Sequence, residues 1–140
     1  AIPLVLVGRN VMKIPPHPDI VYLGFLSEEE KFAALNGAAM LMMPSPYESL
    51  SMVTLEAWAL EKPVLANGGC EVLRGQCRRS QAGLFYDDYD DFKGALQLML
   101  HDKRLCRRLG SNGKTYFQTH YTWDVIENKY LSIIDQVEGT

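Results

Sequence analysis

No stretch of the sequence is apolar for long enough to cross a bilayer, and no charged and then apolar leader opens the chain. Cysteine is scarce: Cys70, Cys77 and Cys106 are odd in number and lack C-x-x-C spacing, and the three histidines are scattered. These residues therefore give no zinc pattern and favour reduced thiols. A net charge of −3 without a dominant basic stripe argues against nucleic-acid binding. We expect a cytoplasmic protein without a metal.

One local cluster departs from this acidic balance. Lys103, Arg104, Arg107 and Arg108 are spaced three to four residues apart on a predicted helix. Two interpretations stay open: a solvated helix face, which is usual, or a surface that contacts anionic lipid or a partner domain. In the second case the protein would be peripheral at the cytoplasmic face of a membrane.

The chain has 140 residues, of which 47% are hydrophobic, enough for one compact domain. Short apolar runs bounded by Gly or Pro predict strands, and helical spacing of apolar residues predicts helices. The predicted strands cover residues 4–8, 20–23, 39–43, 63–66 and 84–86, and the predicted helices cover 27–37, 52–60, 92–100, 105–109 and 122–137. No internal repeat competes with this interpretation.

Strands that alternate with helices indicate an α/β fold with a doubly wound parallel sheet, followed here by C-terminal helices. The apolar runs suggest that the strands, including residues 4–8, are buried. In such sheets ligands bind outside the carboxyl ends of the strands. The turns after Leu23, Met43 and Ala66 are therefore the places to search for a site.

Two helix starts are visible in the sequence. Ser27 and Glu30 have the spacing of a capping box, which opens a helix that turns Phe32 and Leu35 inward and ends near Gly37. A second acidic segment, residues 87–91, contains an Asp-x-Asp pattern that binds metal in an unrelated class of transferases. Because acidic residues favour the first turn of a helix, we expect this segment to cap the helix over 92–100.

The helix over residues 52–60 is almost entirely apolar and yet contains Glu56. A charged carboxylate in a buried helix needs a partner. Lys62 is one candidate, and hydroxyl groups of a ligand at the helix start are the other, because Glu56 lies four residues after Met52.

The start of that helix is a candidate anion site. We expect Ser51 to cap it, while the N–H groups of Met52 and Val53 face the carboxyl end of the preceding strand. Glu48 lies in the proline-rich turn over residues 44–48 just before it and faces the same crevice. Two carboxylates eight residues apart at a helix start favour a binding site over two solvated side chains.

These residues match a known signature. The segment 44–59, with glutamates at 48 and 56, resembles the E-x7-E block of the large retaining glycosyltransferase family called group 1, which has the GT-B fold. Similar motifs follow in the same order at residues 24–27, 62–66, 68–69, 83–85 and 121–123. The resemblance covers roughly residues 4–134.

The resemblance implies a role for each matching residue. Glu48 would contact the transferred sugar beside its anomeric carbon, and Glu56 would bind the ribose hydroxyls. The rest of the implied donor site consists of Phe25 and Leu26 at the nucleotide base, Ser45 in the turn, and the backbone N–H groups of Leu50, Ser51, Met52 and Val53 at the sugar and diphosphate. The family often has glycine at position 51. A helix dipole and basic side chains, and no metal, would neutralise the leaving diphosphate.

The resemblance also implies what lies outside residues 1–140. We expect this chain to be a partial donor-binding C-terminal domain, without the first strand and helix of that domain and without the acceptor-binding N-terminal domain. Such a fragment would be inactive alone. Arg9 and Lys13 resemble the family's diphosphate-binding pair but stand too close to the strand over 20–23 to be assigned that role.

The sequence therefore predicts the nucleotide-sugar-binding part of a retaining hexosyltransferase, with a glycan, lipid or other hydroxyl compound as acceptor. Two alternatives stay open: a nucleotide-sugar epimerase of the same fold, and a non-catalytic α/β scaffold or regulatory module. The last helix has apolar residues outside its main stripe, Val125 and Leu131. We expect this helix to pack one face on the sheet, and the fragment to dimerise through those two residues or to leave the helix poorly ordered.

Overall fold

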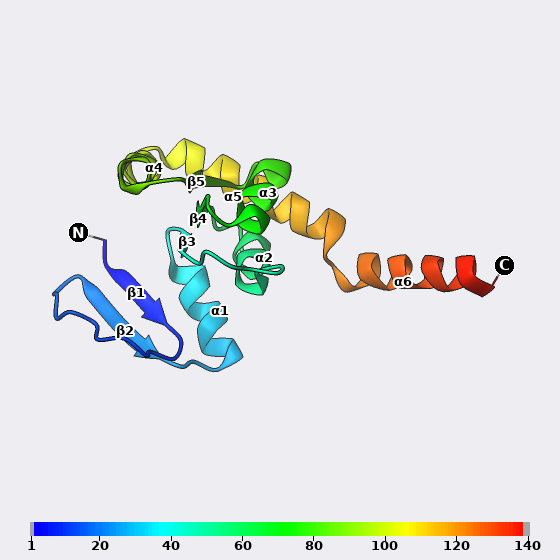
Figure 1. The fold of residues 1–140 in the computed structure, drawn as a ribbon, viewed down its shortest axis with the longest axis horizontal. Coiled ribbons are helices and arrows are strands. Elements are labelled where there is room, and N and C mark those ends of the chain that lie inside the picture. Colours follow the sequence, from blue (N-terminus) through cyan, green and yellow to red (C-terminus); the bar gives the residue numbers. More distant parts are fainter. Residues whose placement is uncertain (1, 139–140) are drawn as a thin grey trace. The chain divides into compact units, whose positions relative to one another are not determined.

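The computed structural model describes residues 2–138, which form two compact units, one ending at Gly37 and the other beginning at Ala38 (Figure 1). Each unit contains one parallel sheet. The predicted α/β class, with parallel strands and C-terminal helices, is confirmed. The strands form a two-stranded and a three-stranded sheet, however, where the sequence predicted a single one.

The first unit consists of two strands and a helix. β1 (Leu4–Val7) pairs in parallel with β2 (Ile20–Gly24), and α1 (Glu28–Gly37) follows. The predicted capping box is confirmed, because the Ser27 N–H and hydroxyl both donate to Glu30 Oε2, at 2.9 and 2.8 Å. These bonds favour the charged carboxylate and hold the pKa of Glu30 below its ordinary value.

The apolar side chains of the first unit are largely exposed. Val5 and Val7 of β1 are 44% and 45% exposed, and Phe32 of α1 is 38% exposed, while Leu35 is buried. The predictions that the first strand is buried and that Phe32 points inward are therefore wrong. Two short strands and one helix offer too little surface to cover both faces of a parallel sheet.

The second unit carries the larger sheet, in which β4 lies between β3 and β5 and is parallel to both. Its carboxyl strand ends therefore lie at one edge, as the sequence predicted. The described elements are β3 (Leu41–Met43), α2 (Met52–Ala59), β4 (Val64–Asn67), α3 (Glu71–Ser80), β5 (Gly83–Tyr86), α4 (Tyr89–His101), α5 (Lys103–His120) and α6 (Trp123–Glu138).

Helix α3 was not predicted. Its sequence has a glycine, Gly75, at mid-helix and few apolar residues, which hides the helical period. In the structure Leu73 and Cys77 face the core and are buried, and α3 packs on β4 and β5. This helix is therefore stabilised by its packing on the sheet and not by its own sequence pattern.

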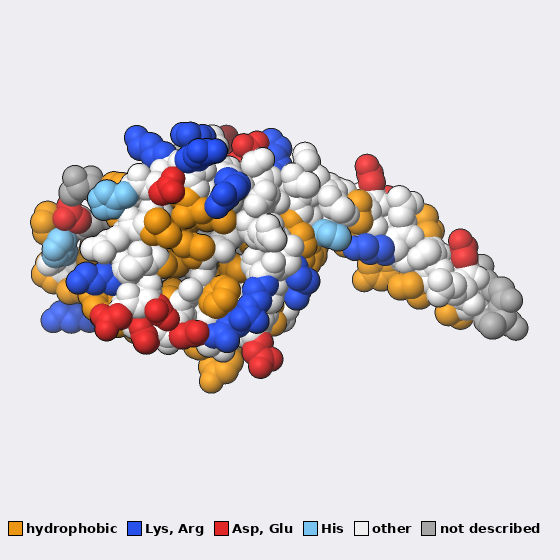
Figure 2. All heavy atoms as spheres, turned by 90° about the horizontal axis from the view of Figure 1, so that it is seen from above, with side chains coloured by type: hydrophobic (Ala, Val, Ile, Leu, Met, Phe, Trp, Pro, Cys, Tyr) orange, Lys and Arg blue, Asp and Glu red, His pale blue; other side chains and the backbone are white. Residues whose placement is uncertain are grey.

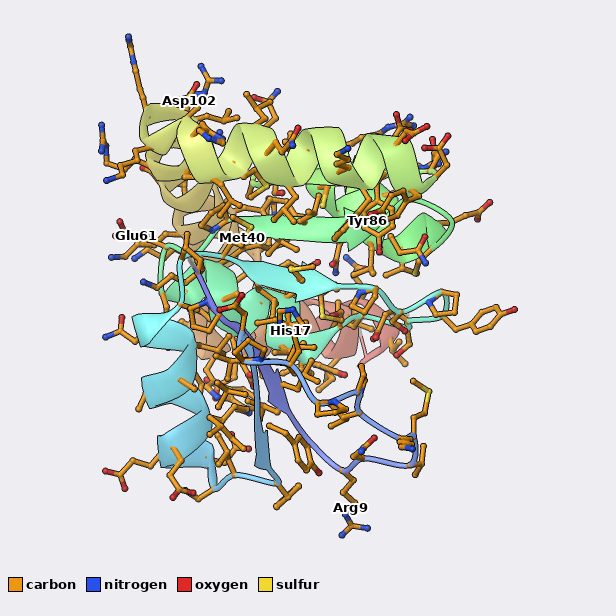
Figure 3. All side chains as sticks on the ribbon, turned by 90° about the vertical axis from the view of Figure 1, so that its left-hand side faces the viewer. Arg9, His17, Met40, Glu61, Tyr86 and Asp102 are labelled. Carbon is orange, nitrogen blue, oxygen red and sulfur yellow. The ribbon has the colours of Figure 1, made fainter. Side chains whose placement is uncertain are left out.

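The acidic segment before α4 caps that helix, as expected. The Asp91 N–H donates to Asp88 Oδ1 at 2.9 Å, and Asp102 caps α5 in the same way, accepting from the Leu105 N–H at 2.8 Å. Figure 3 shows Asp102 where α4 ends, and Tyr86 at the end of β5 beneath α4. Tyr86 packs edge-to-face on Phe92 of α4, and its burial raises the pKa of its phenol.

The core of the second unit is built around Trp58 of α2, which is fully buried. Its indole N–H donates to the carbonyl of Ala82 at 3.1 Å. Helix α5 crosses α2 at two glycines, Gly110 and Gly113, because a Cβ at Gly110 would collide with the backbone of Glu61 and one at Gly113 with the Trp58 ring. The small residues allow the two helices to approach closely.

Helix α6 does not pack on the sheet, so that prediction is wrong. Its principal contacts are with α5 (Figure 1), and apolar side chains are exposed along it (Figure 2), although Val125 and Ile126 near its start are half-buried. Tyr130, Ile133 and Ile134 are 67%, 58% and 49% exposed. Among the described residues of the second unit, no strand is a principal contact of this helix. The basic quartet, Lys103, Arg104, Arg107 and Arg108, is also exposed, on α5.

Candidate functional site

The turn over residues 44–48 leaves β3 in an extended, non-helical path, as its prolines predicted. Its shape is fixed by two hydrogen bonds. The Ser45 hydroxyl donates to the carbonyl of Tyr47 at 2.8 Å, and the Asn67 amide donates to the carbonyl of Pro44 at 3.0 Å. The turn that carries Glu48 is therefore held from within and from the end of β4.

Asn67 also shapes the second loop of the site. Its Oδ1 accepts from the N–H of Gly69 at 2.9 Å, so one side chain binds both the Pro44 turn and the loop that leads into α3. The sequence indicated only the turn after Ala66 as a place to search, without a role for Asn67. Its position as the polar residue that ends a buried strand is the signal that could have identified it.

These two loops enclose an open cavity of about 650 Å³. Glu48 lines it and is half-buried, and Glu71, in the first turn of α3, lines it from the other loop. The complete lining consists of Pro46, Tyr47, Glu48, Ser49, Gly69, Cys70, Glu71 and Val72. The two carboxylates give this cavity a negative charge, which suits a ligand group that develops positive charge.

The start of α2 differs from the prediction in one respect. Ser51 lies at the N-cap position, but its backbone is left-handed, with φ 60° and ψ 78°, and its side chain makes no cap. The Ser51 hydroxyl instead bonds the Thr54 hydroxyl at 2.9 Å, and both side chains are buried. The left-handed conformation costs a non-glycine residue about 1–2 kcal/mol. It gives a physical reason why glycine would suit position 51.

The N–H groups at the start of α2 are available to a ligand. Within residues 2–138 no hydrogen bond uses the N–H of Ser51, and helix geometry leaves those of Met52 and Val53 without an intrahelical partner. The helix dipole adds partial positive charge at the same point. The arrangement can bind an anion such as a phosphate.

Glu56 lies on α2 four residues after Met52, and its Oε2 atom is shielded from solvent, although the residue as a whole is half-buried. No ion pair between Glu56 and Lys62 occurs in the described residues. The structure thus brings Glu48, Ser51, Met52, Val53 and Glu56 together on one turn and one helix.

Phe25 and Leu26 belong to the first unit. Phe25 is 77% exposed, with the Arg9 guanidinium over its ring at 5.8 Å from the centroid, and Leu26 is half-buried. Their exposure after the glycine that ends β2 suits contact with a ligand. The structure describes them only within their own unit, so their place beside α2 stays a prediction.

Gln76 of α3 was not identified from the sequence. It is 1% exposed, and its Nε2 donates to the carbonyl of Leu50 at 2.7 Å. At the next residue, burial raises the pKa of the Cys77 thiol to about 12 and keeps it protonated. Gln76 is thus a buried amide that holds the loop immediately before α2, whereas Cys77 is a packing residue.

Two features are absent from residues 2–138. No three side chains of the metal-ligating types cluster closely enough to hold a metal ion. No described helix is long and apolar enough to span a bilayer.

The chain is similar to proteins of known class. The family described as glycosyl transferases group 1 matches residues 14–116. The chain is 31% identical over 124 residues to the MMP alpha-(1->4)-mannosyltransferase of Mycolicibacterium hassiacum, a match that covers 84% of this chain and 29% of that protein.

Solved structures show the same fold. Sucrose-phosphate synthase from Thermosynechococcus elongatus superposes with a TM-score of 0.75 at 25% identity, covering 86% of this chain and 31% of the synthase. WaaG, a glycosyltransferase of lipopolysaccharide biosynthesis, superposes with a TM-score of 0.71 at 17% identity, covering 91% of this chain and 36% of WaaG. The chain thus spans about a third of the length of these proteins. With the family matched over most of its length, this chain belongs to the group 1 glycosyl transferases.

Proposed function

We propose that this chain is the donor-binding part of a glycosyltransferase that moves a hexose from a nucleotide diphosphate sugar to an acceptor hydroxyl with retention of configuration. The observation that carries the proposal is the start of α2. There, N–H groups without protein partners and a helix dipole lie between two carboxylates, Glu48 in the preceding turn and Glu56 on the helix.

The diphosphate would bind the N–H groups of Leu50, Ser51, Met52 and Val53, with Ser45 holding the adjacent turn. Because the leaving group is then stabilised by the helix dipole and these donors, the proposal requires no metal. Glu56 would accept hydrogen bonds from the ribose hydroxyls, and the backbone at Phe25 and Leu26 would hold the base.

Glu48 is the proposed catalytic residue. It lines the negatively charged cavity together with Glu71. A carboxylate at this place would stabilise the positive charge that develops at the anomeric carbon as the sugar–phosphate bond breaks. The acceptor proton would pass to the departing phosphate, and the new bond would form on the same face of the sugar.

We also propose the setting of this chain within a larger protein. Since the chain spans about a third of its relatives, the acceptor, whether glycan, lipid or another hydroxyl compound, would bind a separate domain. The exposed strands of the first unit would be covered by the rest of the donor domain, and the basic quartet of α5 would face solvent or a membrane surface. A fragment alone would dimerise through Leu131 and Val125 of α6, of which Leu131 is 57% exposed and Val125 half-buried, or would leave that helix poorly ordered.

Nucleotide binding tests the donor site in the 140-residue chain. Glu56→Ala removes a charged acceptor worth about 1.5–3 kcal/mol, so the affinity for UDP or GDP should fall by roughly 10- to 100-fold in calorimetry. Glu127→Ala, an exposed glutamate of α6, is the matched control and should change nothing. Equal affinities of the two variants would contradict the ribose role.

Turnover tests the role of Glu48 in the full-length protein. Glu48→Gln should lower kcat far more than it raises the KM for the donor, because an interaction with a cationic carbon is strongest in the transition state. A roughly tenfold loss of donor affinity at unchanged kcat would make Glu48 a binding residue only. Product anomers resolved by NMR would show retention or inversion.

A further inference from the structure

The loop before α2 contains a peptide whose orientation is unusual. The Leu50 carbonyl points to Gln76 of α3, at 2.7 Å from its Nε2, and the next residue, Ser51, is left-handed with φ 60°. The carbonyl and N–H of one trans peptide point in opposite directions. Fixing the Leu50 carbonyl toward α3 therefore directs the Ser51 N–H away from α3.

The left-handed φ of Ser51 in this orientation is strained, and rotating the peptide would relieve that strain. Rotating the Leu50–Ser51 peptide by half a turn would bring φ of Ser51 from 60° to about −120°, the side of φ that non-glycine residues favour. That rotation would also exchange the two ends of the peptide, so a carbonyl oxygen would face where the Ser51 N–H now faces. An anion at the start of α2 would then meet an acceptor in place of a donor.

Gln76 is buried at a cost that packing does not explain. Its side chain is 1% exposed, and its Oε1 atom has no hydrogen-bond partner in the described part of the chain. Burying an amide whose oxygen accepts no hydrogen bond is unfavourable. An apolar side chain of similar shape would avoid this desolvation cost. What the amide provides at this position is the bond to Leu50.

We propose that Gln76 is a positioning residue that holds the Leu50–Ser51 peptide with its N–H toward the donor diphosphate. Gln76 itself touches no ligand and acts through the Leu50 carbonyl. The inference rests on the proposed function, because it assumes that a diphosphate binds at the start of α2. If it is correct, phosphate binding depends on a residue of α3 as well as on the E-x7-E segment, which lies in the preceding turn and in α2.

The test separates phosphate binding from nucleoside binding in the 140-residue chain. UDP and uridine, and GDP and guanosine, are titrated into each variant, and the ratio of diphosphate to nucleoside affinity is measured. Gln76→Met keeps the shape without the donor, and should lower that ratio about tenfold with nucleoside affinity unchanged. Gln76→Glu should lower the ratio further, because its carboxylate repels the Leu50 carbonyl and accepts the N–H of the rotated peptide.

Gln97, an exposed residue of α4, supplies the matched controls, since Gln97→Met and Gln97→Glu should leave the ratio unchanged. Ser51→Gly supplies a second control. Glycine adopts the left-handed conformation without strain. In its background, Gln76→Met should therefore lower the ratio by much less.

The possible results distinguish failure of the proposed function from failure of the role of Gln76. If the unmodified chain binds diphosphates no better than nucleosides, the proposed function fails and this inference falls with it. If it prefers diphosphates but the Gln76 and Gln97 variants behave alike, or nucleoside affinity falls in parallel, only the inference is overturned. Should the Gln76 variants not fold, NMR of the unmodified chain decides: the Ser51 amide signal must shift with UDP and not with uridine.

Discussion

The two units contain strands of similar apolar sequence and bury them very differently. In β4 of the second unit, Val64 and Leu65 are completely buried, whereas in the first unit Val5 and Leu23 are 44% and 45% exposed. Pairing in parallel requires only suitable backbone and side-chain pattern, and both units achieve it. Burial requires elements on both faces, and only the second unit has enough of them. We infer that the first unit is completed by a surface outside its own residues.

The largest effect should come from equal truncations in the two sheets. Leu65→Ala, in the middle strand of the second unit, should lower the free energy of unfolding by about 2–5 kcal/mol because it leaves a cavity. Leu23→Ala in β2 should cost less than about 1 kcal/mol, since that side chain is already half in solvent. Urea unfolding followed by circular dichroism measures both. Similar costs would mean that Leu23 is covered in solution, and would contradict the difference in burial between the two sheets.

Glycines on two helices sharpen the comparison within the second unit. Gly110→Ala should destabilise it by about 1–3 kcal/mol or more, because the added methyl group meets the backbone of Glu61. Gly94→Ala on α4 has open space around the new Cβ and should stabilise the unit by about 0.5–1 kcal/mol through helix propensity. Thermal unfolding of both variants checks the prediction. A loss for Gly94→Ala would show that α4 is packed more closely than the structure indicates.

Alkaline pH should affect the second unit through Cys77. Its pKa in the folded chain is about 12, raised from an ordinary value of 9.0 by burial. The unfolded state therefore loses this proton first, and the thiol's contribution to stability is complete below pH 9 and is lost as the pH rises toward 12.

Cys77→Ala should accordingly show a shallower fall in the free energy of unfolding between those pH values than the unmodified chain. Ser80→Ala is the matched control, because it truncates a buried side chain of the same helix that does not titrate in this range, and its slope should remain that of the unmodified chain. Identical slopes for Cys77→Ala and the unmodified chain would show that the thiol ionises without penalty.

The most local expected effect lies in the first unit. Ser27→Ala removes the hydroxyl of the capping box and should cost about 1 kcal/mol in the stability of α1. Amide exchange should become faster in the first turn of α1 and remain unchanged in β4. Faster exchange throughout both units would show that they unfold together.

Sequence reasoning identified most of this fold because its signals are local. The capping residues of α1 and α4 and the prolines after β3 act within a few residues of themselves, and each was predicted correctly. Helix α3 was missed because its period is obscured by Gly75 and its stability depends on contact with β4 and β5. The predicted packing of α6 on the sheet was wrong for a related reason, because an apolar stripe on a helix does not show which surface will cover it.

The sequence by itself determined the order of the strands and of every helix except α3, and the pair of glutamates, Glu48 and Glu56, around one helix start. Only the tertiary structure decided that Ser51 is left-handed, that Asn67 joins the two loops of the cavity, and that Gln76 holds the Leu50 carbonyl. Gln76 is 26 residues from Leu50 along the chain, and no local pattern connects them. Such pairs form only when a packed core brings separate segments together, because burial then requires each buried polar group to find a partner.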